Sequence, residues 1–390
     1  MAAEDMKHYF DSRREELVKL TAELVAARTV NPPGDEWRAV EVIERYLGPP
    51  GIPCSRHEKE KGRTNLVVRI GTGPPALVIV GHIDTVPAGD GWETDPFTVV
   101  ERDGKLYGRG TSDDKGGTAS MLLAGRYLKE HESELGGEVV LVAAADEERG
   151  SKCGMQFLLD EGIVDGDFAI IPDAASEMKT VFIAEKAALF TEITSHGRQA
   201  HGSTPEKGIN AITNLMEVLR RIERMRFDVI DHELLTPPTW NLGMIQGGVA
   251  PNVVPGKCTA ALDMRYLPGD SADTILGRVE AICRDVEKEI PGARFELKVT
   301  MADTPIEVPR DHPLVTAIVE ETQAALGFTP GIGGMSGSTV AKFCVMNDIT
   351  AVNFAPGESA LAHMANECVR IDSLVDFAYV LARIVLRLLK

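Results

Sequence analysis

The sequence predicts an α/β protein that carries a smaller inserted α+β domain. Short apolar runs of strand length alternate with helical stretches over most of the chain, as in a sheet covered by helices on both faces. Between 187 and 301 the pattern changes to β-α-β-β-α-β. A chain of 390 residues also exceeds the usual size of a single core. We therefore predict a discontinuous first domain, 1–186 and 302–390, and an inserted domain, 187–301.

The first domain begins with two amphipathic helices and continues with buried strands. Leu17, Leu20 and Leu24 recur at helical spacing, which predicts a helix over about 10–28, and a second helix follows over about 36–48. Continuous apolar runs predict a mixed central sheet whose strands are buried on both faces. Strands are predicted at 65–70, 76–80, 138–145, 168–171 and 349–355, and further helices at 118–130, about 155–160 and 374–389.

The inserted domain has the element order of a ferredoxin-like fold. This order builds a four-stranded antiparallel sheet with two helices on one face, and such a unit can fold alone. The buried-strand pattern returns at 349–355, which is why we interpret the domain as an insertion. Its strands are predicted at 189–194, 239–246, 257–266 and 293–300, and its helices at 208–224 and 272–288.

Composition excludes several classes of partner. The formal net charge is −18, so an extended phosphate backbone is a poor partner, and we expect no nucleic acid. No apolar run reaches the length that spans a membrane, and the polar first residues lack the apolar core of a secretory signal. The six cysteines form no C-x-x-C pair, which is typical of reduced thiols. We therefore expect a cytoplasmic protein without a membrane partner.

Side chains that bind metals follow the predicted strands of the first domain. In open α/β sheets the ligand crevice lies beyond the carboxyl ends of the strands, so residues distant in sequence can converge there. Each residue alone has an ordinary explanation, such as a helix start, an N-cap, a turn or a loop histidine. Together they favour a site. These residues are His82, Glu147, Glu148, Asp173 and His363, with Asp113 in a glycine-rich segment before a helix.

The residue types favour two transition-metal ions. Two histidines with several carboxylates suit zinc, cobalt or manganese, whereas calcium and magnesium prefer oxygen ligands throughout. One ion would use His82 and the other His363, with Asp113 as the natural bridge. One carboxylate of the Glu147–Glu148 pair is then left over, and it can act as a general base. Asp84 is a candidate to orient the ring of His82.

Four motifs together resemble a known family. They are G-H-I-D-T-V-P at 81–87, G-R-G-T-S-D-D-K-G at 108–116, D-E-E at 146–148 and H-M-A-N-E at 363–367. This set is similar to the zinc metallohydrolase family of acetylornithine deacetylase, succinyl-diaminopimelate desuccinylase, aminoacylase and glutamate carboxypeptidase. The resemblance covers essentially the whole chain. It implies a catalytic metal-binding domain and a smaller inserted domain that acts as a lid and often dimerises, and hence a homodimer.

The resemblance also implies a role for each residue of the first domain. The expected cofactors are two divalent metal ions, zinc in the first place and cobalt as the alternative. The peptide bond after Asp113 is often cis in the family. By the resemblance, His82 is a terminal ligand with Asp84 behind it, Asp113 the bridge, Glu147 the general base, Glu148 a ligand of one ion, Asp173 of the other, and His363 the last ligand.

The inserted domain and a later loop supply the expected substrate contacts. His201 matches a histidine that reaches over the metals and stabilises the developing oxyanion, and it can act across a dimer interface. Asn252 and Arg265 match positions that hold the substrate carboxylate, and the fork of arginine suits that task. Gly337 and Ser338 lie in a loop that is similar to a glycine-rich substrate loop, whose backbone amides can receive a carboxylate.

Three positions depart from the nearest family pattern. Val340 and Lys342 stand where the desuccinylase has an aspartate and often an arginine, and Asp114 is more familiar from the peptidase branches. The sequence therefore predicts a metal-dependent hydrolase that cleaves the amide bond of an N-acyl amino acid or small peptide, similar to deacetylases and desuccinylases. A carboxypeptidase or dipeptidase of the same family is the alternative. A non-catalytic binding module on the same scaffold is a more remote one.

Overall fold

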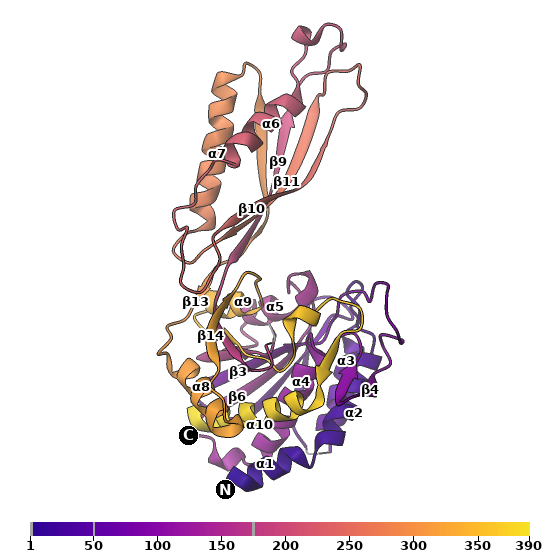
Figure 1. Ribbon diagram of the computed structural model, residues 1–390, viewed down its shortest axis with the longest axis vertical. Coiled ribbons are helices and arrows are strands. Elements are labelled where there is room, and N and C mark those ends of the chain that lie inside the picture. Colours follow the sequence, from indigo (N-terminus) through magenta and orange to yellow (C-terminus); the bar gives the residue numbers. More distant parts are fainter. Residues whose placement is uncertain (1–2, 50, 174–175) are drawn as a thin grey trace. The chain divides into compact units, whose positions relative to one another are not determined.

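The protein folds into two compact units, seen in the computed structural model of Figure 1, which describes residues 3–49, 51–173 and 176–390. The first unit combines the residues up to Ile183 with Val308–Gly333 and Thr339–Lys390. The second consists of Ala184–Glu307 and the short segment Gly334–Ser338. It begins slightly before the predicted 187 and ends slightly after the predicted 301. The segment Gly334–Ser338 was expected in the first domain, but it packs with the second unit.

The first unit is built on a mixed sheet, which confirms the predicted fold class. Its strand order is β1-β2-β6-β3-β7-β15-β8, and β14 pairs with β8. Strand β13, whose residues belong to the second unit, pairs with Ala184 and Glu185 at the end of β8. At its centre, β3 is parallel to β6 and β7, and β7 is parallel to β15. The carboxyl ends of these strands therefore share one edge. The strands are β1 Cys54–Glu58, β2 Thr64–Gly71, β3 Ala76–His82, β6 Glu138–Ala144, β7 Phe168–Ile171, β8 Thr180–Glu185, β13 Ile306–Glu307, β14 Gly331–Met335 and β15 Thr350–Asn353.

Helices flank this sheet. Helix α4 packs on β3 and against α2 and α10, whereas α9 packs on β15 and β7. In the described part of the chain, none of the helices combines the length and apolar character that a membrane crossing needs. The helices are α1 Ala3–Asp11, α2 Arg14–Ala26, α3 Trp37–Leu47, α4 Lys115–Glu130, α5 Met155–Asp160, α8 Pro313–Leu326, α9 Ala341–Met346 and α10 Ile371–Leu388, with 3-10 turns η1 Glu132–Glu134, η2 Glu147–Arg149 and η4 Ser359–Leu361.

Three helices differ from the sequence prediction. The predicted helix over 10–28 is preceded by a separate helix, because α1 ends at Asp11 and α2 begins at Arg14. Helices α8 and α9 were not predicted, although the signals for α8 are in the sequence. Pro313 occupies the first turn, the side chain of His312 caps it, and Gly327 ends it with a φ of 78°.

A small sheet brings two distant motifs together. It has the order β16-β5-β4, with β4 Val100–Arg102, β5 Lys105–Tyr107 and β16 Cys368–Arg370. Cys368 lies opposite Tyr107 in the antiparallel pair of β16 and β5. The residues just before Cys368 therefore lie beside those just after Tyr107. This pairing places the H-M-A-N-E motif at 363–367 next to the glycine-rich segment at 108–116.

The second unit has the predicted βαββαβ order. Its sheet runs β10-β11-β9-β12 with every neighbouring pair antiparallel. Side chains from α6, α7 and the strands form a separate core around Leu215, Leu262 and Val279. Asn210 and Ser271 cap the two helices through their side chains. The elements are β9 Ala187–His196, η3 Pro205–Lys207, α6 Ala211–Ile222, β10 Thr239–Gly247, β11 Lys257–Tyr266, α7 Ala272–Glu289 and β12 Arg294–Ala302.

Candidate metal centre and active site

His82 ends strand β3 with both ring nitrogens beside carboxylates. Its side chain is 3% exposed, and Nε2 lies 2.9 Å from Oδ1 of Asp113. Nδ1 lies 3.4 Å from Oδ1 of Asp84 and 3.2 Å from the Asp84 carbonyl oxygen. Burial alone would lower the pKa of His82, but Asp113 and Asp84 raise this pKa well above its usual value. Asp84 thus holds one ring nitrogen and leaves the other directed at Asp113.

Asp113 is shared by two groups of possible metal ligands. One group consists of His82, Asp113 and Asp173, and the other of Asp113, Glu148 and His363. Within each group the candidate ligand atoms lie within 4.8 Å of one another. The ends of four strands and the segment before α4 thus bring together the metal-type residues that the sequence singled out, apart from Glu147, which belongs to neither group.

His363 approaches the second oxygen of Asp113. Its Nε2 lies 3.3 Å from Oδ2 of Asp113 and 3.1 Å from Oε2 of Glu148. These two carboxylates raise the pKa of His363 to about 10. The residue has a φ of 62°, in the left-handed region, and its side chain is 55% exposed. It therefore forms the open side of the cluster, whereas His82 forms the closed side.

Glu147 and Glu148 lie on the short turn η2 after strand β6. Their backbone N–H groups donate to the two oxygens of Asp84, at 3.1 Å and 3.2 Å. Burial raises the pKa of Glu147 well above its usual value, and Asp173 raises it further. One carboxylate, Asp84, therefore orients both the His82 ring and the turn that carries the paired glutamates.

Asp114 lies behind His82 in a space that two glycines leave open. The peptide bond between Asp113 and Asp114 is cis, which confirms the expectation from the resemblance. Oδ2 of Asp114 accepts the backbone N–H of His82 at 3.1 Å. A Cβ on Gly117 would lie 2.2 Å from Oδ1 of Asp114, and one on Gly81 would lie 2.3 Å from Oγ1 of Thr118 and 3.1 Å from Oδ2 of Asp114. Both positions therefore require glycine for this packing.

Glu367 holds the loop that carries Asp113, a role that the sequence analysis missed. Its Oε1 accepts the N–H groups of Ser112 at 2.8 Å and Asp113 at 3.1 Å. Its Oε2 accepts from Gly110 N at 3.0 Å and from Nη1 of Arg109 at 2.7 Å. The side chains of Arg109 and Glu367 are 1% and 0% exposed. Both lie in the quoted motifs, but the long sequence separation between them gave no signal that they pair.

These residues fit a pair of divalent cations. The two groups contain only imidazole nitrogens and carboxylate oxygens, which are donors that zinc, cobalt and manganese accept. Carboxylates placed this close repel one another unless positive charge lies between them. Contacts with His363 and His82 hold the pKa of Asp113 below its usual value against the opposing effect of burial.

His201 and Asn252 lie together in the second unit. Nδ1 of His201 accepts the backbone N–H of Ser203 at 3.1 Å and lies 2.7 Å from its hydroxyl oxygen. A neutral His201 therefore carries its proton on Nε2, where it can donate a hydrogen bond. The carbonyl of Asn252 accepts the N–H of Gly202 at 2.7 Å, so these two candidates are neighbours.

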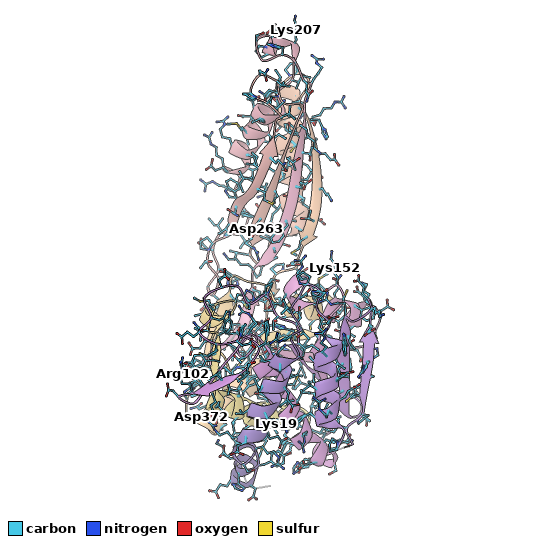
Figure 2. The ribbon with its side chains drawn as sticks, turned by 90° about the vertical axis from the view of Figure 1, so that its right-hand side faces the viewer. Lys19, Arg102, Lys152, Lys207, Asp263 and Asp372 are labelled. Carbon is cyan, nitrogen blue, oxygen red and sulfur yellow. The ribbon has the colours of Figure 1, made fainter. Side chains whose placement is uncertain are left out.

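Arg265 does not join them. Along β11, Arg265 lies opposite Ala188, whereas Lys257, at the other end, lies opposite His196. At the usual rise of about 3.4 Å per residue, Arg265 and Lys257 are roughly 27 Å apart. His201 and Asn252 lie in the loops beyond the Lys257 end. Figure 2 shows these two ends of the second unit, with Lys207 labelled at one and Asp263 at the other. Within one chain, Asn252 and Arg265 therefore cannot bind the same small carboxylate. The guanidinium of Arg265 pairs with Asp263, with Nε 2.8 Å from Oδ1.

Gly337 and Ser338 also belong to the second unit. The hydroxyl of Ser338 donates to Oδ2 of Asp303 at 3.3 Å. The carbonyl of Met335 accepts the N–H of Lys186 at 3.2 Å. These contacts fix the glycine-rich loop to residues next to the ends of β9 and β12, although most of the chain around the loop in sequence belongs to the first unit.

Comparisons with known proteins agree with this architecture. A sequence model described as peptidase family M20/M25/M40 matches residues 78–387. The chain is 31% identical to acetylornithine deacetylase of Myxococcus xanthus, over 81% of this chain and 80% of that protein. It is 28% identical to a probable succinyl-diaminopimelate desuccinylase of Staphylococcus epidermidis, over 93% of this chain and 95% of that protein.

A solved structure supports the same fold. The aminopeptidase PepT of Bacillus cereus superposes with a TM-score of 0.79 and 22% identity, covering 97% of this chain and 99% of that one. At this level of identity the likeness establishes the fold alone.

The Arg109–Glu367 pair leads to a stability prediction. Glu367→Gln removes the charge that pairs with a buried guanidinium, so we expect the free energy of unfolding to fall by about 3 kcal/mol. Urea unfolding measures it. Glu93→Gln is the control, because Glu93 pairs with Arg102 at 3.5 Å on the surface, and its loss should change stability by less than about 0.5 kcal/mol. Equal losses in the two variants would contradict the assignment.

Proposed function

Because the chain belongs to peptidase family M20/M25/M40, we propose that this metal-dependent hydrolase cleaves the amide bond of an N-acyl amino acid or small peptide. The observation that carries the proposal is the pair of ligand groups that share Asp113, with Glu147 next to them. The names of the relatives, a deacetylase and a desuccinylase, favour an N-acyl amino acid as the substrate class.

The two ligand groups would hold the cofactors. His82 and Asp173 would bind one divalent ion, Glu148 and His363 the other, and Asp113 both. Zinc is the first expectation and cobalt the alternative. When bound, such a pair of ions acidifies a water molecule and polarises the amide carbonyl.

Glu147 is the general base in this proposal. Glu148 belongs to a ligand group and Glu147 to none. Glu147 is therefore the carboxylate that is free of a ligand role and can accept and donate a proton. It takes a proton from the attacking water as the new C–O bond forms. It then gives that proton to the leaving nitrogen as the C–N bond breaks, which releases a carboxylate and an amine.

Residues of the second unit would contact the substrate. The Nε2–H of His201 donates to the oxyanion that develops on the amide oxygen. Arg265 and the backbone amides at Gly337 and Ser338 receive the substrate carboxylate. Because Asn252 and His201 lie at the far end of the sheet from Arg265, we propose that these two serve the active site of a second copy in a homodimer.

Strand β10 is the proposed dimer edge. It is an edge strand without a charged residue, and the side chain of Met244 is 71% exposed. A groove of about 590 Å³, lined in part by Met216, Trp240, Leu242 and Ile245, runs between it and α6. The opposite edge strand, β12, carries Arg294, Glu296 and Lys298, charges that oppose edge-to-edge pairing. Two β10 strands can pair antiparallel around a twofold axis.

We also propose that the enzyme works in a reducing compartment such as the cytoplasm. All six cysteines are free thiols, and five of them are buried. Buried thiols contribute to packing as small apolar groups, and no disulfide is needed to hold either unit.

A substrate panel tests the reaction. We expect chelation to abolish hydrolysis, and zinc or cobalt to restore it on N-acetyl and N-succinyl amino acids. Turnover is measured in parallel on dipeptides and acyl-glutamates. Turnover on these alone would favour the carboxypeptidase or dipeptidase alternative. Absence of bound transition metal, with no hydrolysis after zinc or cobalt is added, would favour a non-catalytic binding module.

The base assignment is tested by Glu147→Gln. This variant keeps the shape of the side chain but cannot accept the proton, so kcat should fall by at least about 100-fold. The metal content, measured by elemental analysis, should stay at the wild-type level, because Glu147 belongs to neither ligand group. Glu161→Gln, at an exposed position after α5, is the control and should retain activity. Unimpaired turnover in Glu147→Gln would remove this residue from the role.

The dimer edge is tested by Met244→Lys. A charge at this position should block strand pairing, so light scattering after gel filtration should show a monomer. If His201 serves the partner's site, hydrolysis is lost as well. Val299→Lys is the matched control, because Val299 is 42% exposed on the other edge strand, and this variant should stay dimeric and active. A dimeric Met244→Lys would contradict the assigned edge, and an active monomer would contradict the action across the dimer.

A further inference from the structure

We propose that Arg63, acting through Glu36 and Asp146, is a positioning residue for the turn that carries Glu147 and Glu148. The inference rests on the proposed function insofar as it calls Glu147 the base. Arg63 contacts neither ligand group. It reaches the site through a buried chain of hydrogen bonds.

Arg63 forms a two-pronged pair with Glu36 and a third contact with Asp146. Its Nε lies 2.8 Å from Oε2 of Glu36, and its Nη2 lies 2.6 Å from Oε1. The same Nη2 donates to Oδ1 of Asp146 at 2.9 Å. The side chains of Arg63, Glu36 and Asp146 are 13%, 0% and 7% exposed. The guanidinium thus offsets two buried carboxylates and fixes their relative orientation.

Asp146 is the residue at which strand β6 turns into η2. Its φ of 63° and ψ of 20° lie in the left-handed region, which few residues other than glycine occupy. Its backbone N–H donates to Oε1 of Glu36 at 3.2 Å, and its Oδ2 accepts the N–H of Cys153 at 3.0 Å. Together with Arg63, these contacts hold the backbone and the side chain of Asp146 at the start of the turn.

Asn31 connects Asp146 to Asp84. Its Nδ2 donates to Oδ1 of Asp146 at 3.1 Å and to Oδ2 of Asp84 at 2.8 Å. Asp84 in turn accepts the N–H groups of Glu147 and Glu148. A displacement of Asp146 therefore changes the direction of both N–H groups and with them the two glutamate side chains.

The loop before α3 is shaped to receive the pair of Arg63 and Glu36. Gly34 has a φ of 100°, and a Cβ there would lie 2.5 Å from Nε of Arg63 and 2.6 Å from Oε2 of Glu36. The ion pair thus occupies the space that any other residue at this position would fill. Asn31 and Glu36 stand on either side of this glycine, so one loop delivers both partners of Asp146.

The test compares Arg63→Gln with a matched arginine on β2, the strand that begins directly after Arg63. Arg69 of β2 also pairs with two acids, Glu138 at 2.5 Å and Asp165 at 3.0 Å. Glu138 is the first residue of β6, at the end of the strand away from Asp146. We expect Arg63→Gln to lower kcat by about 10- to 100-fold with KM within about threefold. Arg69→Gln should match the wild type, and Arg63→Lys should recover only part of the loss.

Metal binding gives a readout that does not depend on turnover. In calorimetric titrations of metal-free protein with Co²⁺, at least one binding step of Arg63→Gln should be weaker by about tenfold or more, because Glu148 shares the displaced turn. Arg69→Gln should titrate as the wild type does. If the wild-type protein with metal bound hydrolyses none of the panel substrates, the proposed function fails, and these titrations alone decide the positioning role.

A second pair of variants covers the case in which Arg63→Gln does not fold. Asn adopts the left-handed region more readily than Ala and keeps an acceptor oxygen, which Ala lacks. Asp146→Asn should therefore lose less kcat and less metal affinity than Asp146→Ala. Unchanged kcat and metal affinities in Arg63→Gln would overturn the proposal. So would equal losses in Arg63→Gln and Arg69→Gln, or in the two Asp146 variants.

Discussion

The carboxylate of Asp84 is the group on which the candidate active site depends. It lies beside Nδ1 of His82 and receives the N–H groups of Glu147 and Glu148 and the amide of Asn31. Burial alone would raise its pKa, but the contacts with His82 and Asn31 hold the pKa of Asp84 below its usual value. A buried, ionised carboxylate with this many donors has a single favourable orientation. It therefore fixes an imidazole from one strand relative to two glutamates from another.

Charge is arranged around this carboxylate in two layers. The outer layer consists of buried acids that form ion pairs with arginines: Glu36 pairs with Arg63, and Glu367 pairs with Arg109. The inner layer consists of the two ligand groups, which contain only acids and histidines. Buried charge requires compensation, and in the outer layer the protein supplies it from its own side chains. In the inner layer, divalent cations would supply it, so the outer pairs can be strong without competing for the metal ligands.

The sequence analysis found the residues that meet in the two ligand groups but not the residues that hold them in position. His82, Glu148, Asp173 and His363 were found because each follows a buried strand, and the carboxyl ends of parallel strands share an edge. Asn31, Glu36 and Arg63 carry no such signal, because they precede or separate secondary structure elements and their partners are distant in sequence. The separation of Asn252 from Arg265 was missed because motif spacing does not reveal which end of a strand a residue occupies. The register of β11 does.

The assignment of residues to units has a consequence for specificity. Every residue of the two ligand groups, and Glu147, lies in the first unit, whereas Arg265, His201 and the loop Gly334–Ser338 lie in the second. The loop is held there by Lys186 and Asp303, so its position follows the second unit even though most of the chain on both sides of it belongs to the first. Under the proposed function, the residues of the second unit contact the substrate. Because each unit has its own core, substitutions in the second unit need not disturb the packing that orients the acids and histidines of the first. Within the proposed function, the metal chemistry of the first unit and the substrate contacts of the second can therefore vary independently.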